Sequence, residues 1–238
     1  IIPIYNEEEI LARQLAKMMA EIDKILPRSA YEIILVENGS LDATYKIAQK
    51  LARQKSNIRA FHLENPSYGQ AFKEGIKRAN HKVIVQFDID FWDIDFLDHS
   101  LNLLDRYDIV IGSKNLGASS DKRPFTRRLI SKSVEFFLKY YFGVPFSDTH
   151  GLKTIRKSLI LPLINKIQSQ NLFFDSELLI MCHYLNYSFI ELPVNIREIR
   201  RTRFSFLINV VDTIKEFSKL ITMKSSLVRL AYDTIILR

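Results

Sequence analysis

The sequence is poor in cysteine and lacks any long hydrophobic run, internal repeat or low-complexity tract. Its single cysteine, Cys182, rules out a disulfide within the chain and fits a reducing compartment. No segment approaches the roughly 18 consecutive apolar residues of a transmembrane helix, so we expect none among these residues. The chain starts at Ile1 without an initiator methionine, and we expect the natural protein to begin further upstream.

The composition is that of a folded protein with an excess of basic residues. Hydrophobic residues make up 47% and charged residues 26% of the 238 positions, which argues against disorder. The length suits one α/β domain with at most a small appendage. The formal net charge of +7 leaves a nucleic acid, an anionic lipid or a phosphorylated molecule open as a partner, and residues 197–238 carry +5 of it.

Hydrophobic spacing predicts strands that alternate with helices in the first half of the chain. Short apolar runs indicate strands at residues 1–4, 31–36, 58–63, 82–87 and 109–111. Apolar positions at helical spacing lie between them, with Asn6 as the expected cap of the first helix and acidic residues in its first turn. This order is typical of right-handed βαβ units, so we predict an α/β fold with a mostly parallel central sheet flanked by helices.

The second half of the sequence is less regular. We expect helices at residues 127–142, 158–167 and 175–184, and strands at residues 149–155 and 189–196. Residues 204–221 and 227–237 have the apolar spacing of two amphipathic helices. The sequence therefore predicts an α/β domain at residues 1–203 and an amphipathic C-terminal segment at residues 204–238.

Acidic and amide side chains follow several of the predicted strands. Asp88 and Asp90 end the fourth strand, and in an extended chain they would share one face. Paired carboxylates of this kind suit Mg²⁺ or Mn²⁺ with phosphate oxygens, although such acids can also be solvated or cap a helix, as Asp93 and Asp95 could. Because the carboxyl ends of parallel strands meet at one edge, we expect one polar cleft there.

With these segments the chain resembles the inverting glycosyltransferases of the GT-A fold. Within them it is similar to the polyprenyl-phosphate glycosyltransferases such as the dolichol-phosphate mannose synthases. The resemblance rests on segments that follow in order along nearly the whole chain, at residues 3–8, 37–44, 65–75, 88–90, 112–114, 148–153 and 191–194.

The resemblance implies a binding site for a nucleotide-diphosphate sugar, GDP-mannose or UDP-glucose. It assigns donor contacts to Pro3, Tyr5, Glu7, Glu37, Asn38, Gly69, Asp88, Asp148 and Glu177. Asp88 and Asp90 would hold Mg²⁺ or Mn²⁺ against the diphosphate. Asn38 replaces an aspartate of the family, and Trp92 replaces a glutamine that often completes the metal shell.

The resemblance also implies a site for polyprenyl (dolichyl) phosphate. It assigns acceptor contacts to Ser131, Lys132, Arg200 and Arg201 and names as catalytic residues Asp90, Lys114, Arg127 and Arg128. Lys114 stands in place of an arginine and keeps the charge without the bidentate fork. For Lys132 a solvated helix start is an equal alternative, and for His150 a surface or packing role is preferred to catalysis.

Membrane contact is a further expectation. The apolar stripe within residues 206–221 lies beside basic side chains, and the helix around Phe136 and Tyr140 is rich in aromatic residues. Such helices are typical of an anionic membrane surface, although packing on the sheet is the commoner role. Together with the resemblance, this predicts a location on the cytoplasmic face of a membrane, peripheral or anchored by residues outside this sequence.

The predicted function is transfer of mannose or glucose to polyprenyl phosphate with inversion at the anomeric carbon. A lipid phosphate is already anionic near neutral pH, so a general base is less necessary. One alternative is transfer to a saccharide hydroxyl, with Asp93 or Asp95 as base, and another is a catalytically weak nucleotide-sugar-binding protein. No recognition motif accompanies the basic charge, so we expect no nucleic-acid partner.

Overall fold

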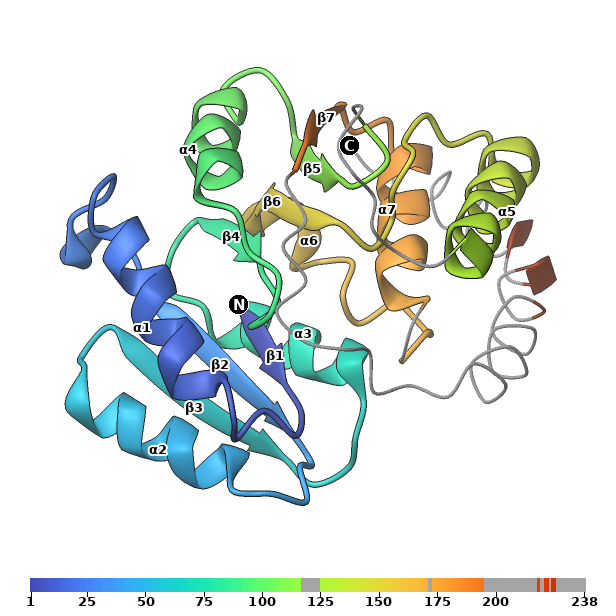
Figure 1. Ribbon diagram of the computed structural model, residues 1–238. Helices are drawn as coiled ribbons and strands as arrows, with labels where there is room; N and C mark the ends of the chain where they lie inside the picture. The colour runs from blue at the N-terminus through green and yellow to red at the C-terminus, as the bar shows by residue number, and fades with distance from the viewer. Residues whose placement is uncertain (117–124, 171–172, 195–217, 219–220, 223, 226–238) are drawn as a thin grey trace.

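The computed structural model describes residues 1–116, 125–170 and 173–194, together with 218, 221–222 and 224–225. Within these residues the predicted α/β class is confirmed (Figure 1). The predicted helices at residues 204–221 and 227–237 lie almost wholly outside the described residues, as do Arg200 and Arg201. The proposed division at residue 203 therefore stays a prediction.

The first half of the chain forms a parallel sheet with strands in sequence order. It contains β1 (Ile2–Ile4), β2 (Ile33–Asn38) and β3 (Ile58–Leu63). All positions of β2 are buried, as expected for the central strand of a parallel sheet that is covered on both faces. The register pairs Ile4 with Glu37 and Glu37 with His62, so the carboxyl ends of the three strands lie side by side.

Helices cover both faces of this sheet. Helices α1 (Leu11–Ile22) and α2 (Thr44–Gln54) lie on one face, and α3 (Tyr68–Arg78) lies on the other (Figure 1). Alternation along β2 explains the two layers, because successive side chains point to opposite faces. Ile33 and Leu35 belong to the core beneath α1, whereas Ile34 and Val36 pack in the core that contains α3.

The second half adds a four-stranded sheet in the order β4-β6-β5-β7. Its strands are β4 (Val83–Gln86), β5 (Ile109–Ser113), β6 (Leu152–Arg156) and β7 (Phe189–Pro193). Strand β6 runs antiparallel to β4 and β5, which is the exception to the predicted parallel order, whereas β5 and β7 are parallel. The backbone of Ile1 bonds to Val85 O (2.7 Å) and Phe87 N (3.2 Å), so β1 joins the two sheets.

The remaining helices cover the second sheet. Helix α4 (Ile94–Leu103) joins the core of α1, and α7 (Phe174–Tyr184) joins the core of α3, so both cores run across both sheets. Helix α5 (Phe125–Phe142) lies at the edge of the fold beside α7 (Figure 1). A short 3₁₀ turn, Arg28–Ala30, precedes β2.

Two predicted helices differ from the structure. The expected helix at residues 158–167 is reduced to α6 (Lys157–Ile160), because Pro162 lacks an amide hydrogen and cannot continue it. Asn6 does not cap α1, which begins at Leu11 without acidic residues in its first turn. Asn6 instead adopts a positive φ of 54°, a conformation that asparagine tolerates in tight loops.

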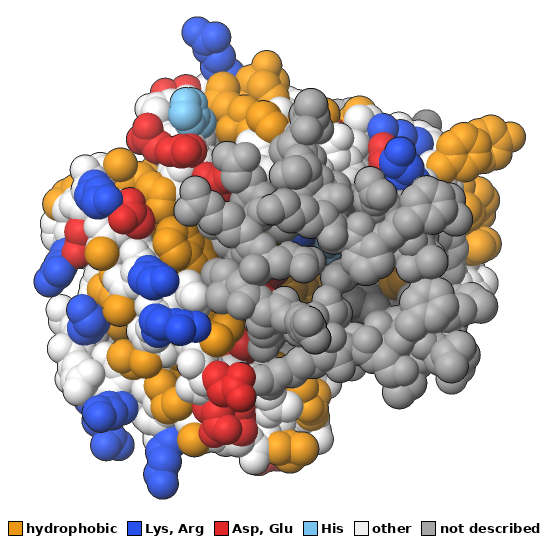
Figure 2. All heavy atoms as spheres, in the orientation of Figure 1, with side chains coloured by type: hydrophobic (Ala, Val, Ile, Leu, Met, Phe, Trp, Pro, Cys, Tyr) orange, Lys and Arg blue, Asp and Glu red, His pale blue; other side chains and the backbone are white. Residues whose placement is uncertain are grey.

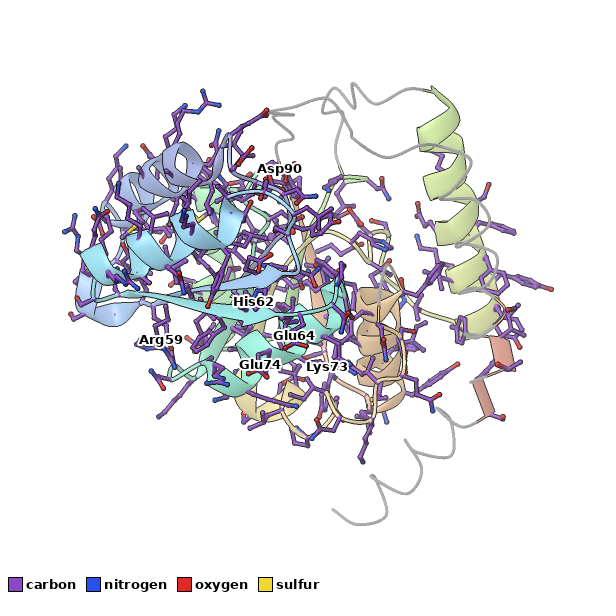
Figure 3. The ribbon with its side chains drawn as sticks, turned by 90° about the horizontal axis from the view of Figure 1, so that it is seen from below. Arg59, His62, Glu64, Lys73, Glu74 and Asp90 are labelled. Atoms are coloured by element: carbon purple, nitrogen blue, oxygen red, sulfur yellow. The ribbon has the colours of Figure 1, made fainter. Side chains whose placement is uncertain are left out.

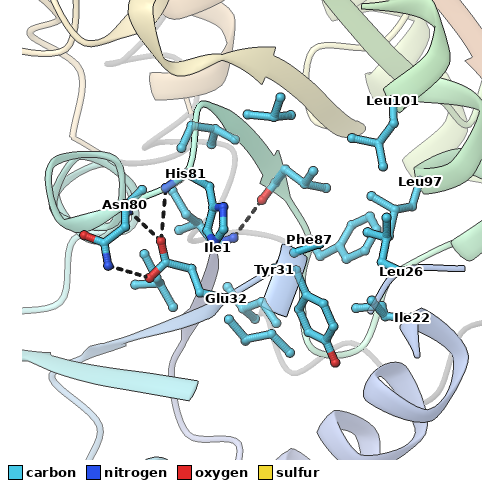
Figure 4. A pocket seen from close by; sticks show the side chains of 18 of the residues that line it. Ile1, Ile22, Leu26, Tyr31, Glu32, Asn80, His81, Phe87, Leu97 and Leu101 are labelled. Atoms are coloured by element: carbon cyan, nitrogen blue, oxygen red, sulfur yellow. Dashed lines mark hydrogen bonds between the residues drawn. The ribbon is translucent and has the colours of Figure 1, made fainter. Parts of the chain in front are cut away.

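A cavity of about 560 Å³ lies at the opposite end of the strands from their carboxyl ends. It opens between the starts of β2 and β4, and its walls are largely apolar, with Ile22, Leu26, Leu97 and Leu101 among the side chains (Figure 4). No cluster of cations or carboxylates is available there among its lining residues to bind a diphosphate. The expected polar cleft must therefore be sought at the other edge.

Candidate active site

The loops that follow β1 and β2 are tied together at the carboxyl edge of the sheet. The amide of Asn6 donates to Ser40 Oγ (2.9 Å), and the amide of Leu41 donates back to Asn6 Oδ1 (2.9 Å). The amide of Glu7 donates to Thr44 Oγ1 (2.6 Å). These bonds hold Asn6 in its positive-φ conformation. They also join two loops that are far apart in sequence into one side of the edge.

Glu37 is buried at the end of β2 and its carboxylate is engaged on both oxygens. One oxygen accepts from the amide of Ser40 and the other contacts His62 Nδ1. The ring of Tyr45 stacks on His62 with centroids 4.7 Å apart. Figure 3 shows Arg59, His62 and Glu64 following one another along β3 toward this edge. His62 was not predicted from the sequence. It lies opposite Glu37 in the register of β2 and β3, and this pairing identifies it.

Asn38 and Gly69, both predicted donor contacts, are engaged in structural contacts around the start of α3, Asn38 with its cap Ser67 and Gly69 with Gln170. Asn38 Oδ1 accepts from the amide of Ser67 (2.5 Å), and Ser67 Oγ donates to the carbonyl oxygen of Gln170 (2.9 Å). The amide of Gly69 donates to the same oxygen at 2.6 Å, and a Cβ at Gly69 would lie 2.8 Å from it. The position therefore requires glycine, and the amide of Asn38 serves here as an acceptor.

Glu177 holds the segment that leads to Gln170. Its side chain is fully buried, and its two oxygens accept from the amides of Gln168 (2.9 Å) and Ser169 (2.7 Å). This arrangement positions the chain opposite Gly69. The predicted contact of Glu177 with the donor sugar stays a prediction.

Asp88 and Asp90 lie on a tight turn beyond β4. The backbone groups of Asp88 and Phe91 exchange hydrogen bonds of 3.0 and 3.1 Å, so the chain reverses at Ile89 and Asp90. The extended conformation thus does not continue, and the expectation of one shared strand face is wrong. Burial of its carboxyl group raises the pKa of Asp88 to about 6, an effect that Lys114 opposes and the charge of Asp90 reinforces.

Lys114 and Asp148 lie beside this turn. Lys114 Nζ is 4.0 Å from the ring centroid of Phe91, and its backbone amide donates to Asp148 Oδ2 (3.1 Å). Asp148 Oδ1 accepts from the amide of His150 (2.9 Å). Asp148 therefore connects the end of β5 with the turn before β6. His150 is exposed, in agreement with a surface role.

The donor atoms at the turn fit a divalent metal that is shared with a substrate. In the described part of the chain, no group of three or more His, Cys, Asp or Glu side chains is arranged to hold a metal by itself. Mg²⁺ commonly uses one or two carboxylates together with substrate phosphates, which Asp88 and Asp90 can provide. Asp93 caps α4 by accepting from the amide of Phe96 (3.0 Å), as the alternative interpretation expected.

Trp92 cannot complete such a metal site. Its Nε1 is buried and has no hydrogen-bond partner within the described residues, and an indole N–H is a donor only. The remaining predicted donor residues line the loop wall: Pro3 is partly buried in β1, Tyr5 is 37% exposed just beyond it, and Glu7 is buried. The ends of β1 and β2 lie side by side, as predicted, and the bonds of Ile1 place β4 beside β1. Lys114, just after β5, lies next to the turn that follows β4.

The predicted acceptor residues are only partly described. Arg127, Arg128, Ser131 and Lys132 all lie on α5, which starts at Phe125. Lys132 is exposed to solvent, and the side chains of Arg127, Arg128 and Ser131 lie outside the described part of the structure. Arg200 and Arg201 lie outside the described residues.

The α/β topology is that of GT-A glycosyltransferases. Residues 1–161 match the model of glycosyl transferase family 2, and the chain belongs to that family. The predicted fold and family are therefore confirmed.

The chain is similar to several named glycosyltransferases. The chain is 27% identical to dolichyl-phosphate beta-glucosyltransferase of Dictyostelium discoideum, covering 98% of this chain and 73% of the relative. It is 26% identical to the human protein of the same name, covering 85% and 68%. Glycosyltransferase AglD of Haloferax volcanii is 24% identical over 82% of this chain, which spans only 32% of that relative.

Solved structures share the fold at low sequence identity. A mannosyltransferase from Pyrobaculum calidifontis in complex with GDP-Man and Mn²⁺ matches with a TM-score of 0.62 and 17% identity, covering 97% of this chain and 68% of that one. Glucosyl-3-phosphoglycerate synthase from Mycobacterium tuberculosis, with Mn²⁺ and UDP-glucose, matches with a TM-score of 0.61 and 15% identity, covering 87% and 73%. These likenesses establish the fold alone.

The raised pKa of Asp88 predicts a stability cost at neutral pH. Between pH 3.8, the ordinary pKa, and about 6, the folded protein binds a proton at Asp88 that the unfolded chain releases, so stability falls as pH rises through this window. We expect Asp88→Asn to raise the free energy of unfolding at pH 7.5 by on the order of 1–3 kcal/mol, and to raise it less at pH 4.5.

Urea unfolding of both proteins in metal-free buffer measures this difference. Asp105→Asn, at an exposed position after α4, is the matched control and should change little at either pH. Equal stability of Asp88→Asn and the unmodified protein at pH 7.5 would show that burial does not penalise the Asp88 carboxylate.

Proposed function

We propose that this protein transfers a hexose, with glucose as the first candidate, from a nucleotide-diphosphate sugar to a polyprenyl (dolichyl) phosphate with inversion. The single observation that carries the proposal is the acid turn of Asp88 and Asp90 at the shared carboxyl edge of the strands. The names of the Dictyostelium and human relatives favour glucose and a dolichyl phosphate acceptor. UDP-glucose is then the first donor to test, and GDP-mannose the second.

The residues at the edge have separable tasks in this proposal. Asp88 and Asp90 would hold Mg²⁺ or Mn²⁺, which supplies neutralisation of the leaving diphosphate. Lys114, fixed beside the turn by its backbone bond to Asp148, adds a positive charge near the same phosphates. The acceptor phosphate needs no base because it is already anionic, and alignment of the two substrates supplies much of the remaining rate.

One contact speaks against transfer to a saccharide hydroxyl. That alternative needs a carboxylate base near the acceptor, for which Asp93 and Asp95 were the candidates. Asp93 is engaged as the cap of α4, and Asp95 is exposed in the first turn of the same helix. A carboxylate that caps a helix is engaged by the backbone amides of its first turn, as Asp93 is by the amide of Phe96. This favours the lipid phosphate acceptor.

A face of α5 supports contact with a membrane surface. Phe136 and Tyr140 are 71% and 83% exposed, and their rings stack one helical turn apart with centroids 6.1 Å apart. Lys132 and Lys139 are exposed on the same helix. Figure 2 shows apolar side chains projecting over α5 next to basic ones. Among the described residues, no helix has the length and hydropathy to cross a membrane. From the exposed rings and lysines of α5 we propose contact with the cytoplasmic face of a membrane, peripheral or together with an anchor outside these residues.

Lipid extraction tests the proposed reaction. The protein is incubated with polyprenyl phosphate, Mn²⁺ or Mg²⁺, and radiolabelled UDP-glucose or GDP-mannose, and the label that enters the organic phase is counted. We expect transfer from one donor, and a loss on the order of 10²–10³-fold in Asp90→Ala because the leaving diphosphate loses its metal. Asp105→Ala should retain full activity. Label that stays in the aqueous phase with every donor would contradict the lipid acceptor.

Vesicle flotation tests the membrane contact. The double variant Phe136→Ser/Tyr140→Ser removes two exposed rings without opening the core, so we expect weaker binding to vesicles that contain anionic lipid and an unchanged melting temperature. Leu161→Ser, at an exposed apolar position outside α5, is the control and should bind as the unmodified protein does. Equal flotation of all three proteins would contradict a role for this face.

A further inference from the structure

Four polar side chains meet behind the acid turn, and each comes from a different element. They are Tyr68 on α3, Gln86 on β4, Lys153 on β6 and Asp175 on α7. Lys153 Nζ lies 3.4 Å from Asp175 Oδ2, and Gln86 Nε2 donates to the same carboxylate at 3.2 and 3.3 Å. The hydroxyl of Tyr68 donates to Asp175 Oδ2 (3.3 Å) and accepts from Gln86 Nε2.

Stability does not explain why this cluster is present. Lys153 is 0% exposed and Asp175 is 2% exposed, so both charges have lost their water. Replacing a buried ion pair by apolar residues of similar volume is often neutral or stabilising, because desolvation offsets the attraction. Gln86 adds a further cost, since its Oε1 is buried without a partner in the described part of the chain. A role other than stability is therefore indicated.

The cluster connects the segments that carry the candidate active site. Gln86 is the last residue of β4 and lies two residues before Asp88. Lys153 Nζ also donates to the carbonyl oxygen of Gly151 (2.9 Å), in the turn that carries Asp148. Tyr68 begins α3 between Ser67 and Gly69, the two residues that contact Gln170. A shift of the ion pair would therefore move three parts of the same edge together.

We propose that Tyr68, Gln86, Lys153 and Asp175 form a positioning unit that holds the turn of Asp88 and Asp90 in the geometry that binds a divalent metal and the donor diphosphate. The inference rests on the proposed function, because it assigns the unit to the donor side of that reaction. The four residues do not touch the substrate, and they act through the backbone at Gln86 and Gly151. Groups that orient metal ligands in this way typically contribute 10–100-fold in metal affinity.

The chain offers a direct optical readout of this site. Trp92 is the only tryptophan and lies two residues beyond Asp90. Mn²⁺ is paramagnetic, so its binding at the turn together with UDP should quench the Trp92 fluorescence. The titration reports metal affinity without requiring sugar transfer, and Asp90→Ala should abolish the quenching.

The decisive variant replaces the whole ion pair by apolar side chains, Lys153→Met/Asp175→Leu. We expect a folded protein with a Mn²⁺ affinity reduced 10–100-fold, and a melting temperature lowered only by the loss of the Asp175 acceptor for Gln86 and Tyr68. Arg156→Met/Asp108→Leu removes a second ion pair (3.2 Å) that also includes a residue of β6, and is the matched control that should leave Mn²⁺ affinity unchanged. Tyr68→Phe deletes one hydroxyl only and should weaken Mn²⁺ binding several-fold.

Each outcome of the titration bears on the inference. A folded Lys153→Met/Asp175→Leu protein with unchanged Mn²⁺ affinity would overturn it, as would unchanged affinity in Tyr68→Phe if the double variant fails to fold. Absence of quenching in the unmodified protein would overturn it as well, because no metal site would remain to be positioned. Intact quenching without lipid-linked product in the extraction assay would instead overturn the proposed function and leave the positioning unit in place.

Discussion

The partly buried carboxyl group of Asp88 is the constraint on which the rest of this edge depends. A carboxylate that loses part of its water is costly unless a positive charge compensates it, and at Asp88 the effect of burial on the pKa exceeds the attraction of Lys114. Asp90 on the same turn adds a second negative charge. The arrangement is unfavourable for the protein alone, and in the proposed function a bound cation would compensate the two negative charges. A loss of stability in exchange for function is common at such sites.

The fold holds the Asp88 carboxyl group in place because β1 joins the two sheets. β1 pairs with β2 on one side and bonds through Ile1 to the end of β4 on the other. Because both hydrophobic cores continue across this junction, the turn after β4 has little freedom to relax. Loops tied by Asn6 and Ser40 close one side of the edge, and the segment fixed by Glu177 closes another.

The sequence predicts the elements of the fold better than their contacts. Apolar runs and helical spacing locate the strands of the first sheet, most clearly β2, whose positions are all buried. The antiparallel course of β6 could not be predicted, since a short apolar strand carries no mark of its direction. The turn at Ile89 and Asp90 was missed because it contains no glycine or proline.

The same limit applies to the candidate site. Residues next to strand ends could be named from the sequence, because position along the chain determines their edge. The residues that contact Glu37 and Asp175 could not be predicted, since they come from other strands and helices. Asp175 did carry a usable signal, because it and Glu177 are acidic residues at the start of a largely apolar stretch that forms a buried helix. Asn38 and Glu177 were named from the sequence, but their residue types did not reveal that backbone amides donate hydrogen bonds to them.

The central claim is that the turn of Asp88 and Asp90 is the place where metal and donor diphosphate meet. Anomalous diffraction from crystals soaked with Mn²⁺ and UDP-glucose tests this most directly. We predict one strong manganese peak within about 2.0–2.3 Å of carboxylate oxygens at this turn, with diphosphate density beside it. Manganese bound elsewhere, or nucleotide density in the apolar cavity near Ile22 and Leu101, would contradict the claim.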